Sequence, residues 1–172
     1  TTNTVAATVT VGTSPVGIAY DGTSIWVANF GSRTLSKINP STNAVGTPVS
    51  FSGSVIDTTD PLFAGLIYVA DRGNRRVQVY NSELKNQRII EGMGAPWSVC
   101  INPGPKQYLF SGDGNGKIYK FDLDGKLVGW AQTSLNHGQN GCLVHELHCE
   151  SETVLYKGDC STWQVEKITI GN

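Results

Sequence analysis

The chain has 172 residues, of which 39% are hydrophobic and 16% are charged, so it holds enough apolar material for one folded domain with a core. Its 13 basic and 14 acidic residues give a net charge of -1, without the basic stripe of a nucleic-acid binder or the polybasic patch of a membrane-surface protein. No apolar run approaches the ~20 residues that a membrane-spanning helix needs.

The first predicted element is an extended strand at residues 4–11. Val5, Val9 and Val11 alternate there with Thr and Ala. Alternation of this kind over a short stretch predicts a half-buried β-strand.

Four similar units follow this strand. Each contains an apolar strand that closes on Asn or Asp, and the closing residues are 42, 42 and 46 positions apart. A turn and a second, alternating strand come next, and further extended stretches bring each unit to about four strands. This pattern is typical of a propeller blade, which takes ~40–50 residues. The apolar strands are Ile25 to Asn29, Ile67 to Asp71, Leu109 to Asp113 and Leu155 to Asp159.

The sequence therefore predicts one all-β domain at residues 1–172, a small four-bladed β-propeller of four-stranded antiparallel blades. The blades are expected at about residues 13–51, 54–91, 95–131 and 142–170. The last unit is one strand short, so we expect the strand at 4–11 to pair into it, which closes the ring and removes two exposed edges. The alternatives are a fragment of a longer propeller and two chains joined head to tail in an eight-bladed ring.

The repeats resemble the NHL and YVTN families of propeller repeats over essentially the whole chain. The resemblance to a YVTN unit lies in Ser14 to Ala19 and Ile25 to Asn29, and that to an NHL unit in Tyr68 to Asp71 and Asn74 to Gln78. The C-terminal half is similar to bacterial NHL proteins related to the peptidylglycine amidating lyase propeller. This similarity lies in Cys100 to Pro105, Gly116 to Lys120 and His145 to Leu147.

The lyase relatives imply a zinc ion held in the central channel by histidines of the innermost strands. The equivalent positions here are Gly17, Trp97 and His145, and only one of them can ligate zinc, which needs about three protein ligands. We therefore expect no metal or other cofactor, with zinc or calcium as the less favoured alternative. The candidate ligand-binding residues of the channel or rim are Trp97, His145, Glu146 and Asp159.

The acidic residues that close the repeated strands have a structural explanation. Asp and Asn side chains commonly accept hydrogen bonds from the backbone of a following turn. Because Asp71, Asp113 and Asp159 lie at the repeat spacing, each is expected on a different blade. A structural role is therefore favoured over a shared calcium or acid site.

The four cysteines, Cys100, Cys142, Cys149 and Cys160, allow two disulfides. A tight turn at Ser151 would place Cys142 directly opposite Cys160 on neighbouring antiparallel strands, at a separation that suits a disulfide. We predict that bond, and with it an oxidising compartment. Cys100 and Cys149 are expected as buried free thiols, with a bond between adjacent blades as the alternative.

The leading interpretation is an extracellular, periplasmic or cell-surface binding or assembly module with a protein or glycan partner, because propeller rims present loops on a rigid ring. One alternative is a metal-dependent lyase or hydrolase with a channel site around His145, Glu146 and Asp159. Another is a structural subunit of an extracellular polymer, with self-assembly. No nucleic-acid partner and no membrane span are expected.

Overall fold

The computed structural model describes residues 4–53, 55–59, 66–133, 143–160 and 163–171. The described residues form fifteen β-strands and one short 3₁₀ helix, and the strands assemble into separate antiparallel sheets.

The first sheet holds β1 (Pro15–Tyr20), β2 (Ile25–Asn29), β3 (Thr34–Ile38) and β4 (Val49–Ser50). The second holds β5 (Val55–Thr59), β6 (Leu66–Asp71), β7 (Arg76–Asn81) and β8 (Asn86–Ile90), with the 3₁₀ helix η1 (Arg72–Asn74) between β6 and β7. The third holds β9 (Pro96–Ile101), β10 (Leu109–Asp113), β11 (Lys117–Phe121) and β12 (Leu127–Gln132), and the fourth holds β13 (Glu146–Cys149), β14 (Val154–Asp159) and β15 (Gln164–Thr169).

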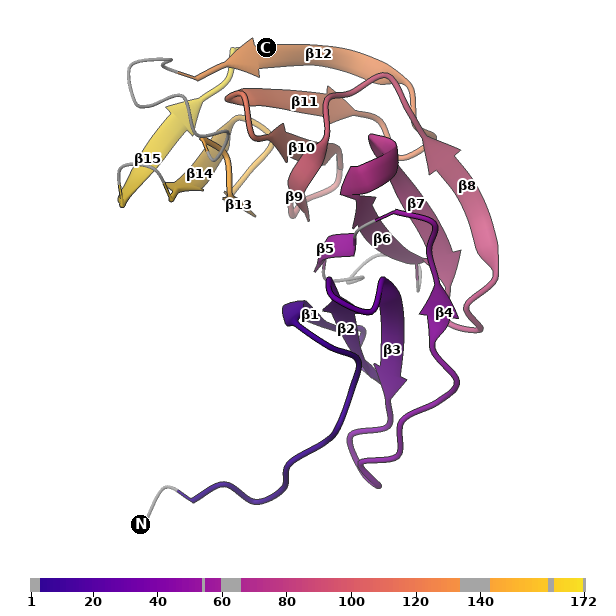
Figure 1. The fold of residues 1–172 in the computed structure, drawn as a ribbon. Coiled ribbons are helices and arrows are strands. Elements are labelled where there is room, and N and C mark those ends of the chain that lie inside the picture. Colours follow the sequence, from indigo (N-terminus) through magenta and orange to yellow (C-terminus); the bar gives the residue numbers. More distant parts are fainter. Residues whose placement is uncertain (1–3, 54, 60–65, 134–142, 161–162, 172) are drawn as a thin grey trace.

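The four sheets follow one another around an arc, with β1, β5, β9 and β13 on its inner side (Figure 1). These first strands of neighbouring sheets contact each other in chain order. The chain thus has an all-β fold of four antiparallel sheets, and the four predicted apolar strands are confirmed as β2, β6, β10 and β14. Three sheets have four strands, whereas the described part of the fourth has three.

Apolar side chains fill each of the spaces between neighbouring sheets. One cluster joins the first two sheets around Trp26 and Leu35, a second joins the middle sheets, and a third joins the last two around Phe110 and Leu155. Trp26, Tyr68 and Phe110 occupy the same position in successive repeats, and all are fully buried. Burial of these faces is the main force that holds the arc together.

Aspartate side chains organise the turns between strands, as the sequence predicts. The Asp113 carboxylate accepts hydrogen bonds at 2.9 Å from the backbone N–H groups of Asn115 and Lys117. Gly116 completes this turn with φ of 88°, a conformation that favours glycine. Asp71 instead accepts from the Arg76 Nε, at 2.8 Å, and from neighbouring amides.

The predicted closure of the ring is not observed. Residues 4–11 form no strand, and within the described part of the chain no strand pairs with the outer edge of β15. The N-terminal segment leads away from β1, and the arc is open (Figure 1). Residues 4–11 are mostly exposed, so burial of apolar surface does not hold them against the fourth sheet.

Candidate functional site

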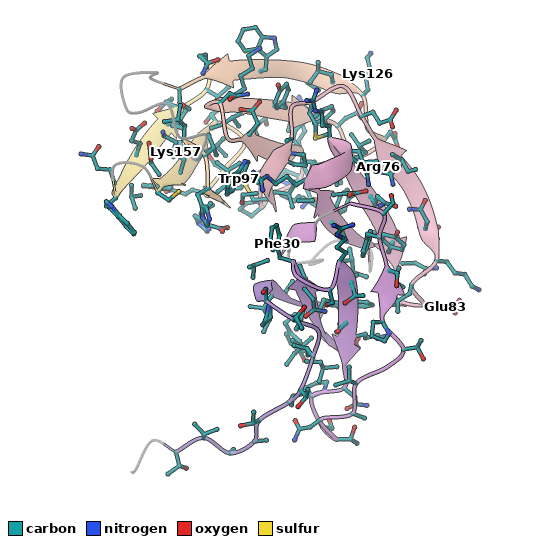
Figure 2. All side chains as sticks on the ribbon, viewed as in Figure 1. Phe30, Arg76, Glu83, Trp97, Lys126 and Lys157 are labelled. Atoms are coloured by element: carbon teal, nitrogen blue, oxygen red, sulfur yellow. A yellow bond between two sulfur atoms is a disulfide. The ribbon has the colours of Figure 1, made fainter. Side chains whose placement is uncertain are left out.

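The best candidate site lies on the inner side of the arc, where η1, β9 and β13 meet. The Arg72 guanidinium carbon lies 3.8 Å from the centroid of the Trp97 indole ring, within the range of a cation–π interaction. The Trp97 and His145 rings follow at a centroid distance of 5.5 Å and an angle of 50°. Arg72 and Trp97 are half-buried and His145 is exposed, so the three side chains form a continuous, accessible surface. Figure 2 shows Trp97 on the inner side of the arc, away from the outer strands.

A β-bulge in β9 turns the Trp97 side chain toward the inner side of the arc. Pro96 pairs with Asp113 and Ser98 pairs with Gly112, so that Trp97 is the extra residue between two consecutive pairs. Such a bulge turns the side chain out of the normal alternation of the strand, and bulges are common beside functional sites. The same irregularity occurs in β1, where Val16 is the extra residue between Pro15 and Gly17. The prediction that Gly17 occupies the position of Trp97 is therefore wrong, because Gly17 pairs as Ser98 does and Val16 has the place of Trp97.

Glu146 adjoins this surface and links β13 to β9. The Ser98 hydroxyl donates to the Glu146 Oε1 at 3.2 Å and accepts from the backbone N–H of Leu147 at 2.9 Å. Partial burial raises the pKa of the Glu146 carboxyl, although the Ser98 hydrogen bond and the nearby His145 act in the opposite direction. We call Arg72, Trp97, His145 and Glu146 the axial cluster.

Asp159 belongs to a different environment. The fully buried Lys157 ammonium lies 3.4 Å from the Asp159 carboxylate and 3.4 Å from that of Glu166, and it donates to the Leu143 carbonyl at 2.9 Å. A buried ammonium requires such partners because its desolvation is costly. Asp159 therefore neutralises Lys157 inside the space between the last two sheets, and it is not part of the axial cluster.

Arg72 is the member of the axial cluster that the sequence does not reveal. It is the first residue of η1, directly after the strand that Asp71 closes. Desolvation lowers the pKa of its guanidinium, which stays charged at neutral pH. Its contact with Trp97 joins two blades across 25 positions of sequence, and no local pattern signals such a contact.

A disulfide joins β9 and β13, the innermost strands of the last two sheets. Cys100 on β9 and Cys149 on β13 are bonded, with their Cα atoms 5.8 Å apart. The expectation of free thiols at these positions is wrong, because β9 and β13 contact each other and run close enough for the alternative, a bond between adjacent blades.

The predicted Cys142–Cys160 bond involves Cys142, which lies outside the described residues. Cys160 is disulfide-bonded, whereas the register behind the prediction is off by two residues, because Cys149 opposes Leu155 rather than Thr153. The turn after β13 is longer than a tight turn at Ser151. The backbone N–H groups of both Glu150 and Ser151 bond to the Val154 carbonyl. Among the described residues no three or more His, Cys, Asp or Glu side chains gather as a metal site would require.

Comparison with known proteins identifies the fold alone. No protein-family model and no curated protein sequence matches the chain. Among solved structures, hydrazine synthase of Kuenenia stuttgartiensis superposes with a TM-score of 0.69 at 15% identity, over 98% of this chain and 53% of that one. The WD40 repeats of RRP9 give 0.74 at 10% identity, over 91% of this chain and 50% of theirs. The computationally designed Ika4 protein gives 0.72 at 13% identity, over 99% and 100%.

These neighbours support a β-propeller-like architecture, and one of them consists of WD40 repeats. The chain spans about half the length of hydrazine synthase and of the RRP9 repeats. In the described residues, no helix is both long and apolar enough to cross a bilayer.

Proposed function

We propose that the chain is a protein-interaction module and that the axial cluster is its binding surface. The observation that carries this proposal is the stack of Arg72 in η1, Trp97 in β9 and His145 directly before β13, on the inner side of the arc. Trp and Arg are enriched among the residues that dominate binding energy at protein interfaces. The propeller-like neighbours support the same reading, because WD40-type folds present such surfaces on a rigid frame.

The chemistry of the cluster favours a partner segment that ends in an acidic or aromatic side chain. The Arg72 guanidinium is a donor that stays charged, and the Trp97 ring beside it offers a flat apolar surface. Glu146 lies beside the stack and holds its carboxyl partly desolvated, so it disfavours a second buried carboxylate on its own side. The partner's acidic group is therefore expected to approach Arg72.

We further propose an extracellular or periplasmic location. The support is the Cys100–Cys149 disulfide, because structural disulfides persist in oxidising compartments and are rare in the cytosol.

Affinity capture tests the proposed surface. Immobilised wild-type protein is expected to enrich a partner from its native source, and Trp97→Ala or Arg72→Ala is expected to lose it. Removal of a central interface Trp or Arg typically costs about 2 kcal/mol or more of binding free energy.

The matched control is Lys85→Ala, because Lys85 is an exposed cation far from the axis that pairs only with Glu83 in the described structure. This variant should retain the partner. Circular dichroism checks that each variant is folded. If the same proteins bind wild type, Trp97→Ala and Arg72→Ala equally, the axial cluster is not the binding surface.

A further inference from the structure

The two ends of the arc carry side chains that belong, by their place in the repeat, inside a sheet–sheet interface. At the C-terminal end, Val165 pairs with Gly158 and is 75% exposed. The residues at the same position in the other three sheets are Leu35, Val77 and Ile118, and each is at most 1% exposed. The outer face of the fourth sheet thus has the side chains of an interface without a sheet against it.

A lysine that lies over an aromatic ring of the neighbouring strand gives a second observation of the same kind. Lys37 lies over Trp26 and Lys120 over Phe110, and both aromatic rings are fully buried between sheets. In the fourth sheet Lys167 lies over Tyr156, at 5.6 Å from the ring centroid, but Lys167 is exposed and Tyr156 only half-buried. Lys167 and Tyr156 thus keep the arrangement of the other pairs, but no sheet of the described residues covers them.

The N-terminal end shows the complementary face. Ile18 is 71% exposed, whereas its equivalents Val99 and Leu147 are buried at 3% and 4%. Tyr20 and Ile25 lie beside it, and together with Ala19 and Pro40 they line an apolar hollow of about 480 Å³. In the three internal interfaces, this face of a sheet always packs on the sheet that precedes it.

The segment before β1 has the position of an outer strand. β4 precedes β5 and β8 precedes β9, each as the outer strand of the preceding sheet, and residues 4–11 stand before β1 in the same way. Gly12, Gly53 and Gly94 reinforce this equivalence. At each of them an added Cβ would lie within 2.7 Å of the side chain of the Asn or Asp that closes the second strand. Residues 4–11 therefore have the place of an outer strand in the chain order but pair with no sheet, and in the described residues β15 has no outer strand beside it.

We infer that these surfaces bind a second copy of this chain, and that two copies close into an eight-bladed ring. The first sheet of each copy covers the Val165 and Tyr156 face of the other, and residues 4–11 of each copy pair with β15 of the other. A second copy is the proposed occupant because it supplies both complementary faces and the outer strand at once. Two copies also match the length of two of the solved structures, hydrazine synthase and the RRP9 repeats, about half of which this chain covers. The twofold axis repeats a head-to-tail contact that closes, so the assembly stops at two copies.

The size of the protein in solution tests this inference. Light scattering and sedimentation from nanomolar to millimolar concentration should show a reversible dimer of twice the chain mass. Ile18→Asp and Val165→Asp should each raise the dimer Kd about tenfold or more, because each buries a carboxylate in an apolar contact. Ile89→Asp is the control, because Ile89 is exposed on β8, away from both ends of the arc, and this variant should remain dimeric.

Hydrogen exchange on the wild-type protein gives a second measurement that requires no variant. Amides of residues 4–11 and 164–169 should gain protection as the concentration rises through the Kd. A protein that stays monomeric throughout overturns the inference and points to further blades of a longer chain as the cover. A dimer that neither Ile18→Asp nor Val165→Asp weakens, or that leaves residues 4–11 unprotected, also overturns it. The axial cluster is untouched in these variants, so loss of the dimer and loss of partner capture are separate results.

Discussion

Asp21 illustrates how a single side chain holds a blade together at the residue scale. Its carboxylate accepts from the backbone and hydroxyl of Thr23, from the backbone of Ser24, and from the buried Trp26 indole Nε1 at 2.7 Å. Burial alone raises the pKa of the Asp21 carboxyl, but these hydrogen bonds outweigh it and hold the pKa below its usual value of 3.8. The carboxylate thus stabilises the fold mainly in its charged form.

Asp21→Ala is expected to lower the free energy of unfolding at neutral pH by about 1–3 kcal/mol, because it leaves the Trp26 N–H buried without its acceptor. Since the pKa of Asp21 is lowered on folding, its contribution is present above pH 3.8 and is lost as the pH falls through the folded value. Urea unfolding at neutral pH and at a pH well below 3.8 measures both effects. The control Asp124→Ala removes an exposed carboxylate and should change stability by about 0.5 kcal/mol or less. Equal losses for the two variants at neutral pH would contradict this account.

At the scale of single elements, the sequence predicts strands well and register poorly. Alternation and the closing Asn or Asp identify β2, β6, β10 and β14, because side-chain period and turn chemistry are local properties. The pairing of β13 with β14 differs from the prediction by two residues, since the turn between them could not be counted from Ser151 alone. The bulges at Val16 and Trp97 were equally hidden, because they depend on how neighbouring strands approach.

The Cys100–Cys149 disulfide gives a prediction for the innermost strands. The bond closes a loop with a sequence separation of 49, and the double variant Cys100→Ala/Cys149→Ala should lose about 2–4 kcal/mol of stability. Thermal unfolding of the double variant and the wild type measures the difference. Hydrogen exchange should show the added opening in β9 and β13 first, since the bond joins these two strands. An unchanged Tm would show that packing alone sets the position of β13.

At the scale of the whole molecule, the repeat count was predictable and the closure was not. Blade number follows from a period that can be read along the sequence. Closure depends on the angle between sheets, which the side chains of two blades determine together. The axial cluster was predictable only in part for the same reason: Trp97, His145 and Glu146 were candidates, whereas Arg72 reaches the cluster through contact between blades.

The arrangement predicts a gradient of stability along the arc. Among the residues that the structure describes, the two middle sheets pack on a neighbouring sheet at both faces, whereas the first and fourth do so at one face. In the Val165→Asp variant in dilute solution, amides of β6, β7 and β10 should exchange more slowly than those of β2 and β14. The difference should be on the order of tenfold, or about 1.4 kcal/mol of opening free energy. Native-state hydrogen exchange measures it, and uniform protection across all four sheets would contradict it.

The bulges of β1 and β9 place a side chain on the inner side of the arc that the pairing of the sheet does not require. Val16, Trp97 and His145 each directly precede the residue that pairs with the next-to-last residue of the second strand, yet they differ in size and polarity. In β1 and β9 this residue is the extra residue of a bulge and is left out of the strand pairing, so the pairing does not depend on its side chain. The side chain at the Trp97 position can therefore change in one blade at a time and alter what the protein binds. The side chains between the sheets continue to stabilise the fold.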